Sequence, residues 1–225
     1  MKMHNLKEIS FNKQGFTLAE VLVTLFIIGV IAAMSIPVAI KSTEKMEYVS
    51  ALRKAHSVLS QSLYTIARNN GYPIGDYTFF NDENFMDEFA QVTNIIKKCQ
   101  TTNECMGSDA ETYQQMYTQL NGSPATDLTS GKTVITADGI MYTFAEPSGT
   151  FGLSESDIAN RLGRIVVDIN GSRAPNRYGR DTFFFYIVNG KGLVPAGHYA
   201  VNDCFVGSSG RTCAAKVIQE SAMKY

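Results

Sequence analysis

The chain of 225 residues contains a hydrophobic segment long enough to span a membrane. No charged side chain occurs from Val21 to Ile40, a run of 20 residues. An α-helix of about that length crosses the roughly 30 Å hydrocarbon core of a bilayer. The pattern predicts a membrane-spanning helix and argues against a fully soluble protein.

Beyond Pro37 the hydrophobic positions recur at steps of three and four, which is typical of a helix with one buried face. This stripe consists of Met46, Val49, Leu52, His56, Leu59, Leu63 and Ile66. Asn69-Asn70-Gly71 is a stop signal, because glycine readily adopts the left-handed conformation that ends many helices. We expect one helix from about Phe16 to Asn69, with a kink at Pro37, where one backbone hydrogen bond is lost.

The remaining chain mixes helical and strand patterns. A second helix is expected over Asn81–Lys98, and a third over Asp109–Leu120. The buried stripe of the second consists of Phe85, Phe89, Val92 and Ile96. The tail, Thr212–Lys224, is expected to form a short helix or a closing strand.

Strand signals gather in the second half of the chain. Asp138-Gly139 predicts a hairpin turn between Lys132–Ala137 and Ile140–Glu146. Runs rich in Val, Ile, Phe and Tyr predict strands over Arg164–Ile169 and Thr182–Val188. The fold class is therefore predicted to be α+β, with the long N-terminal helix packed on a small antiparallel sheet.

Charge is close to balanced overall but uneven along the chain. The formal net charge of −1 excludes a broadly basic nucleic-acid-binding protein. Basic residues outnumber acidic ones both before the apolar segment and over residues 41–70, whereas residues 71–225 are mildly acidic. Because both flanks of the apolar segment are positive, the positive-inside rule does not settle its orientation.

Four cysteines form two pairs that are close in sequence, within polar, loop-like stretches. Cys99 and Cys105 enclose QTTNE, and Cys204 and Cys213 enclose FVGSSGRT. An even number in such stretches favours two local disulfides in an oxidising compartment, which would place this part of the chain outside the cytoplasm. Four cysteines permit three pairings, and free thiols or a four-thiolate zinc site are the alternatives. These spacings fit a zinc site poorly.

The junction KQGFTLAEVLVTLFIIGVIAAMSIP places a cleavage-like site before the apolar run, whereas a conventional secretory signal is cut after it. It resembles the class III signal peptides of type IV pilins and type II secretion pseudopilins. The matching residues are Gly15, Phe16, Thr17, Leu18, Glu20 and Pro37. The resemblance implies that a prepilin peptidase cuts between Gly15 and Phe16, N-methylates Phe16 and leaves the helix in place.

Glu20 is a carboxylate one turn into this apolar helix. A charge at that depth in lipid costs a few kcal/mol, so it calls for a partner or a function. The resemblance implies that Glu20 pairs with the N-terminal amine of a neighbouring subunit during assembly, an amine that exists only after cleavage. The alternative is a carboxylate at headgroup depth that is merely solvated.

The resemblance also implies a domain organisation: a leader (1–15), a transmembrane and filament-core helix (16–40), its amphipathic continuation (41–70) and an α+β head (71–225). The expected location is the inner membrane, with one span and a periplasmic head, and then a periplasmic or extracellular filament. Expected partners are the prepilin peptidase, other pilin or pseudopilin subunits, the inner-membrane assembly platform and membrane lipid. Pilus, secretion pseudopilus and DNA-uptake machine remain open.

Asp168-Ile-Asn170-Gly171, followed by Asp181, begins like a cation-binding loop. It departs from the EF-hand pattern because Gly171 falls at the fourth position instead of the sixth and Gly179 stands where a bidentate glutamate belongs. Major pseudopilins carry calcium near this place, so Asp168, Asn170 and Asp181 are candidate ligands of a structural Ca²⁺. The alternative is an Asx-Gly turn between two strands. No other cofactor is expected.

The sequence contains none of the common catalytic motifs, so we expect no enzymatic activity and no catalytic residues. A basic cluster could contact DNA, although a solvated loop face is the commoner explanation. It consists of Arg161, Arg164, Arg173, Arg177 and Arg180. The alternative functions are a membrane-anchored, non-polymerising module that binds DNA or carbohydrate, and a single-span enzyme whose active site the sequence does not reveal.

Overall fold

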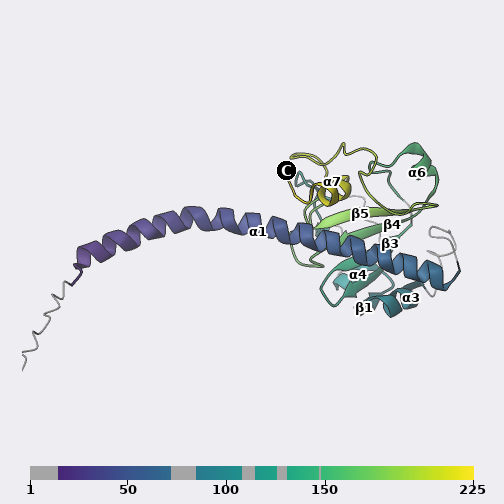
Figure 1. The fold of residues 1–225 in the computed structure, drawn as a ribbon, viewed down its shortest axis with the longest axis horizontal. Helices are drawn as coiled ribbons and strands as arrows, with labels where there is room; N and C mark the ends of the chain where they lie inside the picture. The colour runs from purple at the N-terminus through teal and green to yellow at the C-terminus, as the bar shows by residue number, and fades with distance from the viewer. Residues whose placement is uncertain (1–14, 72–84, 108–114, 126–130, 147) are drawn as a thin grey trace, which may run out of the picture. The chain divides into compact units, whose positions relative to one another are not determined.

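The computed structural model describes residues 15–71, 85–107, 115–125, 131–146 and 148–225. The chain separates into two compact units, Met1–Thr43 and Glu44–Tyr225. Helix α1, Leu18–Asn69, contributes to both units and continues through Pro37 (Figure 1). It ends where the sequence predicts, with Gly71 at a φ of +70°. The kink expected at Pro37 stays a prediction.

The second unit is called the head below, and it includes the C-terminal part of α1 as well as the predicted α+β region (71–225). It is built on a six-stranded antiparallel sheet in the order β1-β2-β3-β4-β5-β6. The strands are β1 Ile95–Cys99, β2 Lys132–Thr136, β3 Met141–Ala145, β4 Arg161–Asp168, β5 Thr182–Val188 and β6 Gly192–Pro195. The predicted hairpin and both predicted strands are confirmed, and so is the α+β class.

Both faces of the sheet are covered, as alternate residues of β5 show. Phe183 and Phe185 belong to the hydrophobic cluster that includes the C-terminal half of α1. Phe184 and Tyr186 belong to a second cluster, on the opposite face, with residues of the connecting loops. Because side chains alternate between faces along a strand, a strand buried on both sides reads as the continuous apolar run TFFFYIV.

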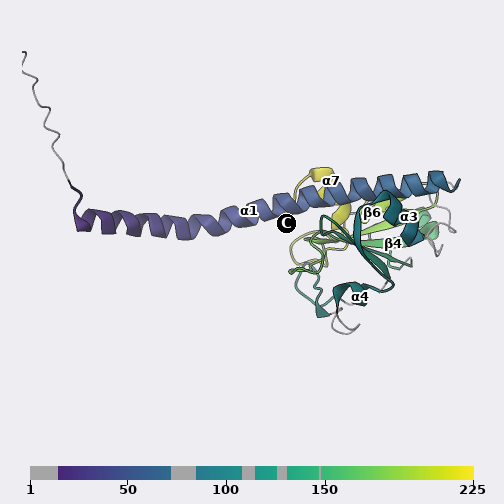
Figure 2. The same cartoon turned by 90° about the horizontal axis from the view of Figure 1, so that it is seen from below.

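Within the head, residues 44–69 of α1 lie along one face of the sheet (Figure 2). Leu52, Leu59 and Leu63 are buried there, as their spacing predicts. His56 is half-buried, with its ring stacked on Phe185 at 5.8 Å between centroids. The prediction for Met46 is wrong: its side chain is 69% exposed, because the buried stripe begins one turn later.

Four short helices complete the described part of the head: α3 Phe85–Val92, α4 Thr102–Met106, α6 Glu155–Ala159 and α7 Cys213–Glu220. The tail is therefore a helix rather than a strand. The residues that follow it lie beside α1, since Lys45 Nζ donates hydrogen bonds to the backbone oxygens of Met223 and Tyr225 at 3.2 and 2.7 Å.

The two other predicted helices need correction. The helix expected over Asn81–Lys98 ends at Val92, and its last residues form β1, where Ile96 is 67% exposed. Ile95–Cys99 pairs with β2, so the sheet ladder overrides the local helical pattern. Residues 81–84 and 108–114 lie outside the described residues. Gln115 is helical, but the helix does not continue to Leu120, since Thr118 forms isolated bridges with Pro124 and Arg177.

Candidate functional site

The N-terminal end of α1 is closed by a reciprocal pair of side chains. The Thr17 backbone amide and hydroxyl both donate to Glu20 Oε2, at 2.8 Å each. The Glu20 amide donates in return to Thr17 Oγ1 at 3.3 Å. This is a capping box, in which two side chains satisfy backbone amides that lack helical partners. Glu20 is therefore held by its own helix start, next to the predicted cleavage position at Phe16.

Beyond this cap, the first part of α1 is exposed and apolar on all sides. Among the described residues, α1 is the one helix long and apolar enough to cross a membrane, and its most apolar stretch has a mean hydropathy of 2.6. Phe26 and Met34 are 72% and 73% exposed. Exposed apolar surface of this extent is stable only in lipid or against other apolar helices.

A family model described as the prokaryotic N-terminal methylation motif matches residues 10–36, which include the capping box and most of this apolar segment. The chain carries the type IV pilin and pseudopilin signature. The match supports a pilin-type precursor, and it covers this N-terminal segment alone. The apolar helix behind the signature fits membrane anchoring. No curated protein and no solved structure matches the chain.

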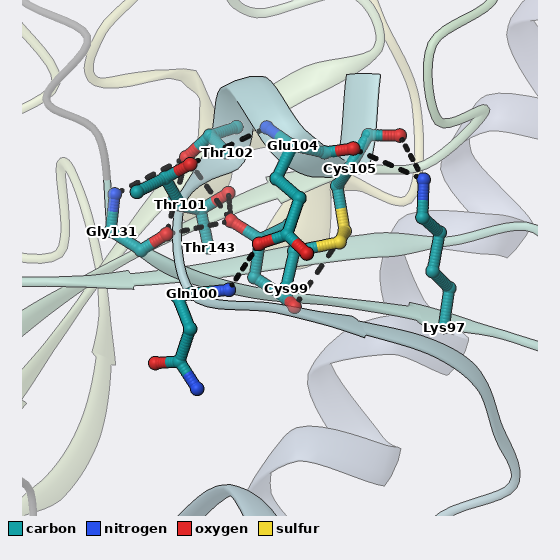
Figure 3. Close-up of a disulfide and its surroundings, with 10 residues drawn as sticks. Lys97, Cys99, Gln100, Thr101, Thr102, Glu104, Cys105, Gly131 and Thr143 are labelled. Carbon is teal, nitrogen blue, oxygen red and sulfur yellow. Dashed lines mark hydrogen bonds between the residues drawn. A yellow bond between two sulfur atoms is a disulfide. The ribbon is translucent and has the colours of Figure 1, made fainter. Parts of the chain in front are cut away.

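Both local disulfides expected from the sequence are present in the head. Cys99, at the end of β1, is bonded to Cys105 in α4, with 5.5 Å between the Cα atoms (Figure 3). Cys204 is bonded to Cys213 at the start of α7, with 4.9 Å between the Cα atoms. In the chain-entropy description, loops this short gain about 2–3 kcal/mol of stability each.

Hydrogen bonds reinforce the first disulfide on both sides of α4. Thr101 caps the helix by accepting from the Glu104 amide at 3.4 Å, and Glu104 Oε2 accepts from the Gln100 amide at 2.9 Å. Lys97 Nζ donates to the carbonyls of Glu104 and Cys105 at 3.1 Å each (Figure 3). The turn is thus held by a covalent bond and by satisfied backbone groups.

The residues of the predicted cation loop are brought together at one end of the central strands. Asp168 ends β4 and pairs in register with Thr182, the first residue of β5, so it lies next to Asp181. Both carboxylates are buried, at 1% and 0% exposure. Tyr117 Oη donates to Asp168 Oδ2 at 2.7 Å. Asn170 Nδ2 lies 3.4 Å from Asp181 Oδ2, so the three predicted residues form one cluster.

The electrostatics of this cluster are unfavourable for two bare carboxylates. Burial, followed by the charge of Asp181, raises the pKa of Asp168 well above its ordinary value. Burial also raises the pKa of Asp181. The hydrogen bonds that oppose these shifts come from neutral donors, namely the Tyr117 and Thr182 hydroxyls and backbone amides. A buried charge without a counter-charge is costly.

The Asx turn anticipated as an alternative is also present. The Asn170 amide donates to Asp168 Oδ1 at 3.2 Å, and Gly171 follows with a φ of +66°. Among the described residues no group of three or more His, Cys, Asp and Glu could hold a metal ion, and this loop supplies only two carboxylates.

Sequence reasoning missed Asn176, which lies in the same loop and is 3% exposed. Its backbone amide is among the groups that act on the Asp181 carboxylate. Its side-chain oxygen is buried and accepts no hydrogen bond within the described part of the chain, and the same holds for Asn170 Oδ1. A φ of +44° at Asn176 is tolerated by asparagine better than by most residues. The sequence signal was an asparagine between the two acidic residues.

The arginine cluster does not form one open basic surface. Arg164 is 1% exposed, with its guanidinium 5.8 Å from the centre of the Phe184 ring. Arg180 pairs with Glu44, and Arg177 Nε lies 3.5 Å from Thr118 Oγ1. Of the five arginines, Arg173 alone is exposed to solvent, and the others are partly or completely buried. The arrangement favours structural roles for this cluster over contact with DNA.

Proposed function

We propose that this chain is a structural subunit of a type IV pilus or type II secretion pseudopilus. Prepilin peptidase cuts between Gly15 and Phe16 and methylates the new amine, and the retained helix anchors the subunit in the inner membrane with its head in the periplasm. Subunits then polymerise through that helix, delivered by the inner-membrane assembly platform. The observation that carries the proposal is the methylation motif at residues 10–36, placed on a helix whose apolar surface is uncovered.

Glu20 is assigned to assembly in this proposal. In the single chain its carboxylate accepts from Thr17, so its charge is accommodated before any partner is present. After cleavage, the Phe16 amine of one subunit offers an ammonium donor to Glu20 of the next, and charge-assisted bonds are stronger than neutral ones. Stacking by one repeated rotation and rise then gives an open helical filament.

The first experiment is intact mass measurement with N-terminal sequencing of the protein from cells that express a prepilin peptidase. The expected product begins at Phe16 and carries one added methyl group. The matched control is Gly15→Lys, which should leave the leader attached. A wild-type chain that starts at Met1 would contradict the proposal and favour a membrane-anchored module that does not polymerise. A chain cut after Ile40 would also contradict it, because the anchor would be lost and a secreted domain would remain.

A further inference from the structure

The loop between β6 and α7 presents apolar side chains to solvent. Four of the seven large hydrophobic residues that are exposed in the described part of the head lie within residues 199–206, called the apolar loop below. They are Tyr199, Val201, Phe205 and Val206, and the first and last are 74% and 79% exposed. Apolar surface gathered in this way on a folded domain marks an interaction site.

The apolar loop is held in place by its own polar groups. Its Cys204 is bonded to Cys213 of α7. The Asp203 amide donates to Thr212 Oγ1 at 2.9 Å, and the Asp203 carboxylate accepts from the Ser209 amide at 2.7 Å. A loop that is already fixed in one conformation loses little entropy on binding, so its exposed side chains are preorganised for a partner.

A groove of about 500 Å³ opens between α1 and the β2–β3 hairpin. Its apolar lining includes Val58, Val92, Ala137 and Tyr142. Tyr142 is 1% exposed, and its hydroxyl makes no hydrogen bond within the described part of the chain, so it can donate to a backbone carbonyl that enters the groove. A cavity of about 150 Å³ already holds a benzene-sized ring, so this groove can take an aromatic side chain and its neighbours.

The apolar loop and the groove lie at opposite edges of the sheet. The loop follows β6, which is one edge strand, and the groove residues Thr93 and Asn94 directly precede β1, which is the other. Figure 1 shows α7 and β1 on opposite sides of α1. A projection and a hollow at different places on one chain can join identical copies in a heterologous contact, which repeats along a filament.

We propose that the apolar loop of one subunit docks in the groove of the next subunit in the filament. Phe205 and Val206 are the side chains that enter the groove. The contact deepens the proposed function and rests on it. A buried aromatic ring covers about 150–250 Å², whereas stable complexes bury about 1,200–2,000 Å² in total. The contact therefore adds to the packing of the N-terminal helices and does not form a dimer by itself.

The charges of the two surfaces suit this pairing. Asp203 is the one acidic residue of the apolar loop, and its carboxylate is bonded to Ser209. In the groove lining Lys54 and Asp138 form an ion pair, with 2.8 Å between Nζ and Oδ2. Docking therefore buries no unpaired charge from either surface. The loop has no lysine or arginine, so it lacks the charge that anionic lipid or nucleic acid attracts.

The test places the photo-crosslinking amino acid p-benzoylphenylalanine at position 205, where it replaces the aromatic Phe205. The full chain is produced in cells with prepilin peptidase and the assembly platform, and sheared filaments are irradiated. We expect a ladder of crosslinked subunits, with peptides that map to residues 54–58, 92–94 or 136–142 of a second copy. The same probe at Tyr64, an exposed residue of α1 outside the groove lining, is the control and should not label these peptides.

The outcomes separate this contact from the proposed function. Filaments that form normally but crosslink from position 205 to lipid, to another protein or to a different surface of a second copy would overturn the contact and leave the proposed function intact. A chain that still starts at Met1 and enters no filament would contradict both.

A substitution in the groove distinguishes a specific contact from chance proximity. Ala137→Arg places a long charged side chain in the lining, and we expect crosslinking from position 205 to fall about tenfold or more. The head should keep its unfolding midpoint, because Ala137 is exposed. Ala159→Arg, at an exposed position of α6 outside the groove lining, is the matched control and should leave crosslinking unchanged. Equal crosslinking in Ala137→Arg and the wild type would show that Phe205 does not occupy the groove.

Discussion

Arg180 and Glu44 form an ion pair that ties the loop after β4 to the start of the head's helix, with 2.8 Å between Nη2 and Oε2. Burial on its own would raise the pKa of Glu44, but the Tyr48 hydroxyl and the Arg180 guanidinium outweigh it, so the pKa lies below its ordinary value of 4.5. The contact therefore joins residues far apart in sequence within one compact unit.

Replacing Arg180 by Ala should cost about 0.2–1 kcal/mol in free energy of unfolding, because both partners are roughly one-third exposed. Because the pKa of Glu44 is lowered in the folded chain, its ionised carboxylate stabilises the fold above pH 4.5. This stabilisation is lost as the pH falls through the pKa that Glu44 has in the folded chain. Urea unfolding at pH 7 and pH 3 measures this, and the difference between variant and wild type should shrink at pH 3. Arg173→Ala, at an exposed position, is the control; an equal cost there would refute a specific role for the pair.

Acidification should weaken the head through His56. Burial lowers its pKa below the ordinary 6.5, so the unfolded chain takes up the proton more readily than the folded one. The stabilisation is complete above pH 6.5 and is lost as pH falls through the lowered folded-state value. Midpoints of thermal unfolding between pH 7.5 and 5 should fall more for the wild type than for His56→Gln, because protonation of the buried Asp168 and Asp181 carboxylates acts in the opposite direction in both chains. His56→Gln should flatten that slope, and an unchanged slope would show that another group is responsible.

Leu59→Ala should destabilise the head by about 2–5 kcal/mol, because Leu59 is fully buried between α1 and the sheet and its loss leaves a cavity. Met46→Ala, in the same helix, should change stability by less than about 0.5 kcal/mol. Chemical denaturation of both variants gives the comparison. Similar costs at the two positions would mean that the buried stripe starts one turn earlier than described.

Replacing Gly197 or Gly122 by Ala separates the cost of a steric clash from the cost of the backbone conformation. The two glycines have nearly the same φ angle, +86° and +88°. A Cβ at Gly197 would lie 2.2 Å from the Thr212 carbonyl oxygen, whereas one at Gly122 meets nothing within 4 Å. Ala at either position costs about 1–2 kcal/mol for the left-handed conformation. Gly197→Ala should cost at least about 1 kcal/mol more, from the clash. Equal losses in denaturant unfolding would show that the loop before α7 moves to accommodate the methyl group.

Glu20→Ala should lower filament incorporation about tenfold or more, because an unpaired terminal amine packed among apolar helices costs a few kcal/mol. The head should keep its unfolding midpoint, since Glu20 lies outside the head unit. Fractionation of sheared filaments from membranes measures incorporation. Glu47→Ala, an exposed acid further along α1, is the control. Normal incorporation of Glu20→Ala would remove Glu20 from the assembly mechanism.

Elements with strong periodicity or definite turn chemistry were predictable from the sequence. The stripe through Leu52 and Leu59 marked the buried side of α1, and Asp138-Gly139 marked the hairpin. Ile95–Cys99 was not predictable, because its helical spacing continues from α3 and only pairing with β2 makes it a strand. α6 carried a usable signal that was overlooked: Ser154 caps it by accepting from the Asp157 amide at 3.2 Å.

The candidate sites also differ in how far the sequence alone could identify them. The N-terminal motif is local in sequence, so Gly15, Phe16 and Glu20 could be identified from their order alone. In the loop, the acidic residues were identified from their spacing, but the contributions of Tyr117 and Asn176 depend on burial and on contacts between distant segments. No periodicity in the sequence reports whether an asparagine oxygen is enclosed without a donor.

The sheet has a simple order, in which each strand pairs with the next one along the chain. The connections between β2 and β3 and between β5 and β6 are short, and closing a short loop costs little entropy, so these two hairpins can form locally as the chain emerges from its N-terminus. Leu59 shares one hydrophobic cluster with residues of β4 and β5, so the amphipathic face of α1 stays incompletely covered until those strands have been made. From the order of the strands we expect α1, the first element of the chain to be made, to complete its packing only after the central strands exist.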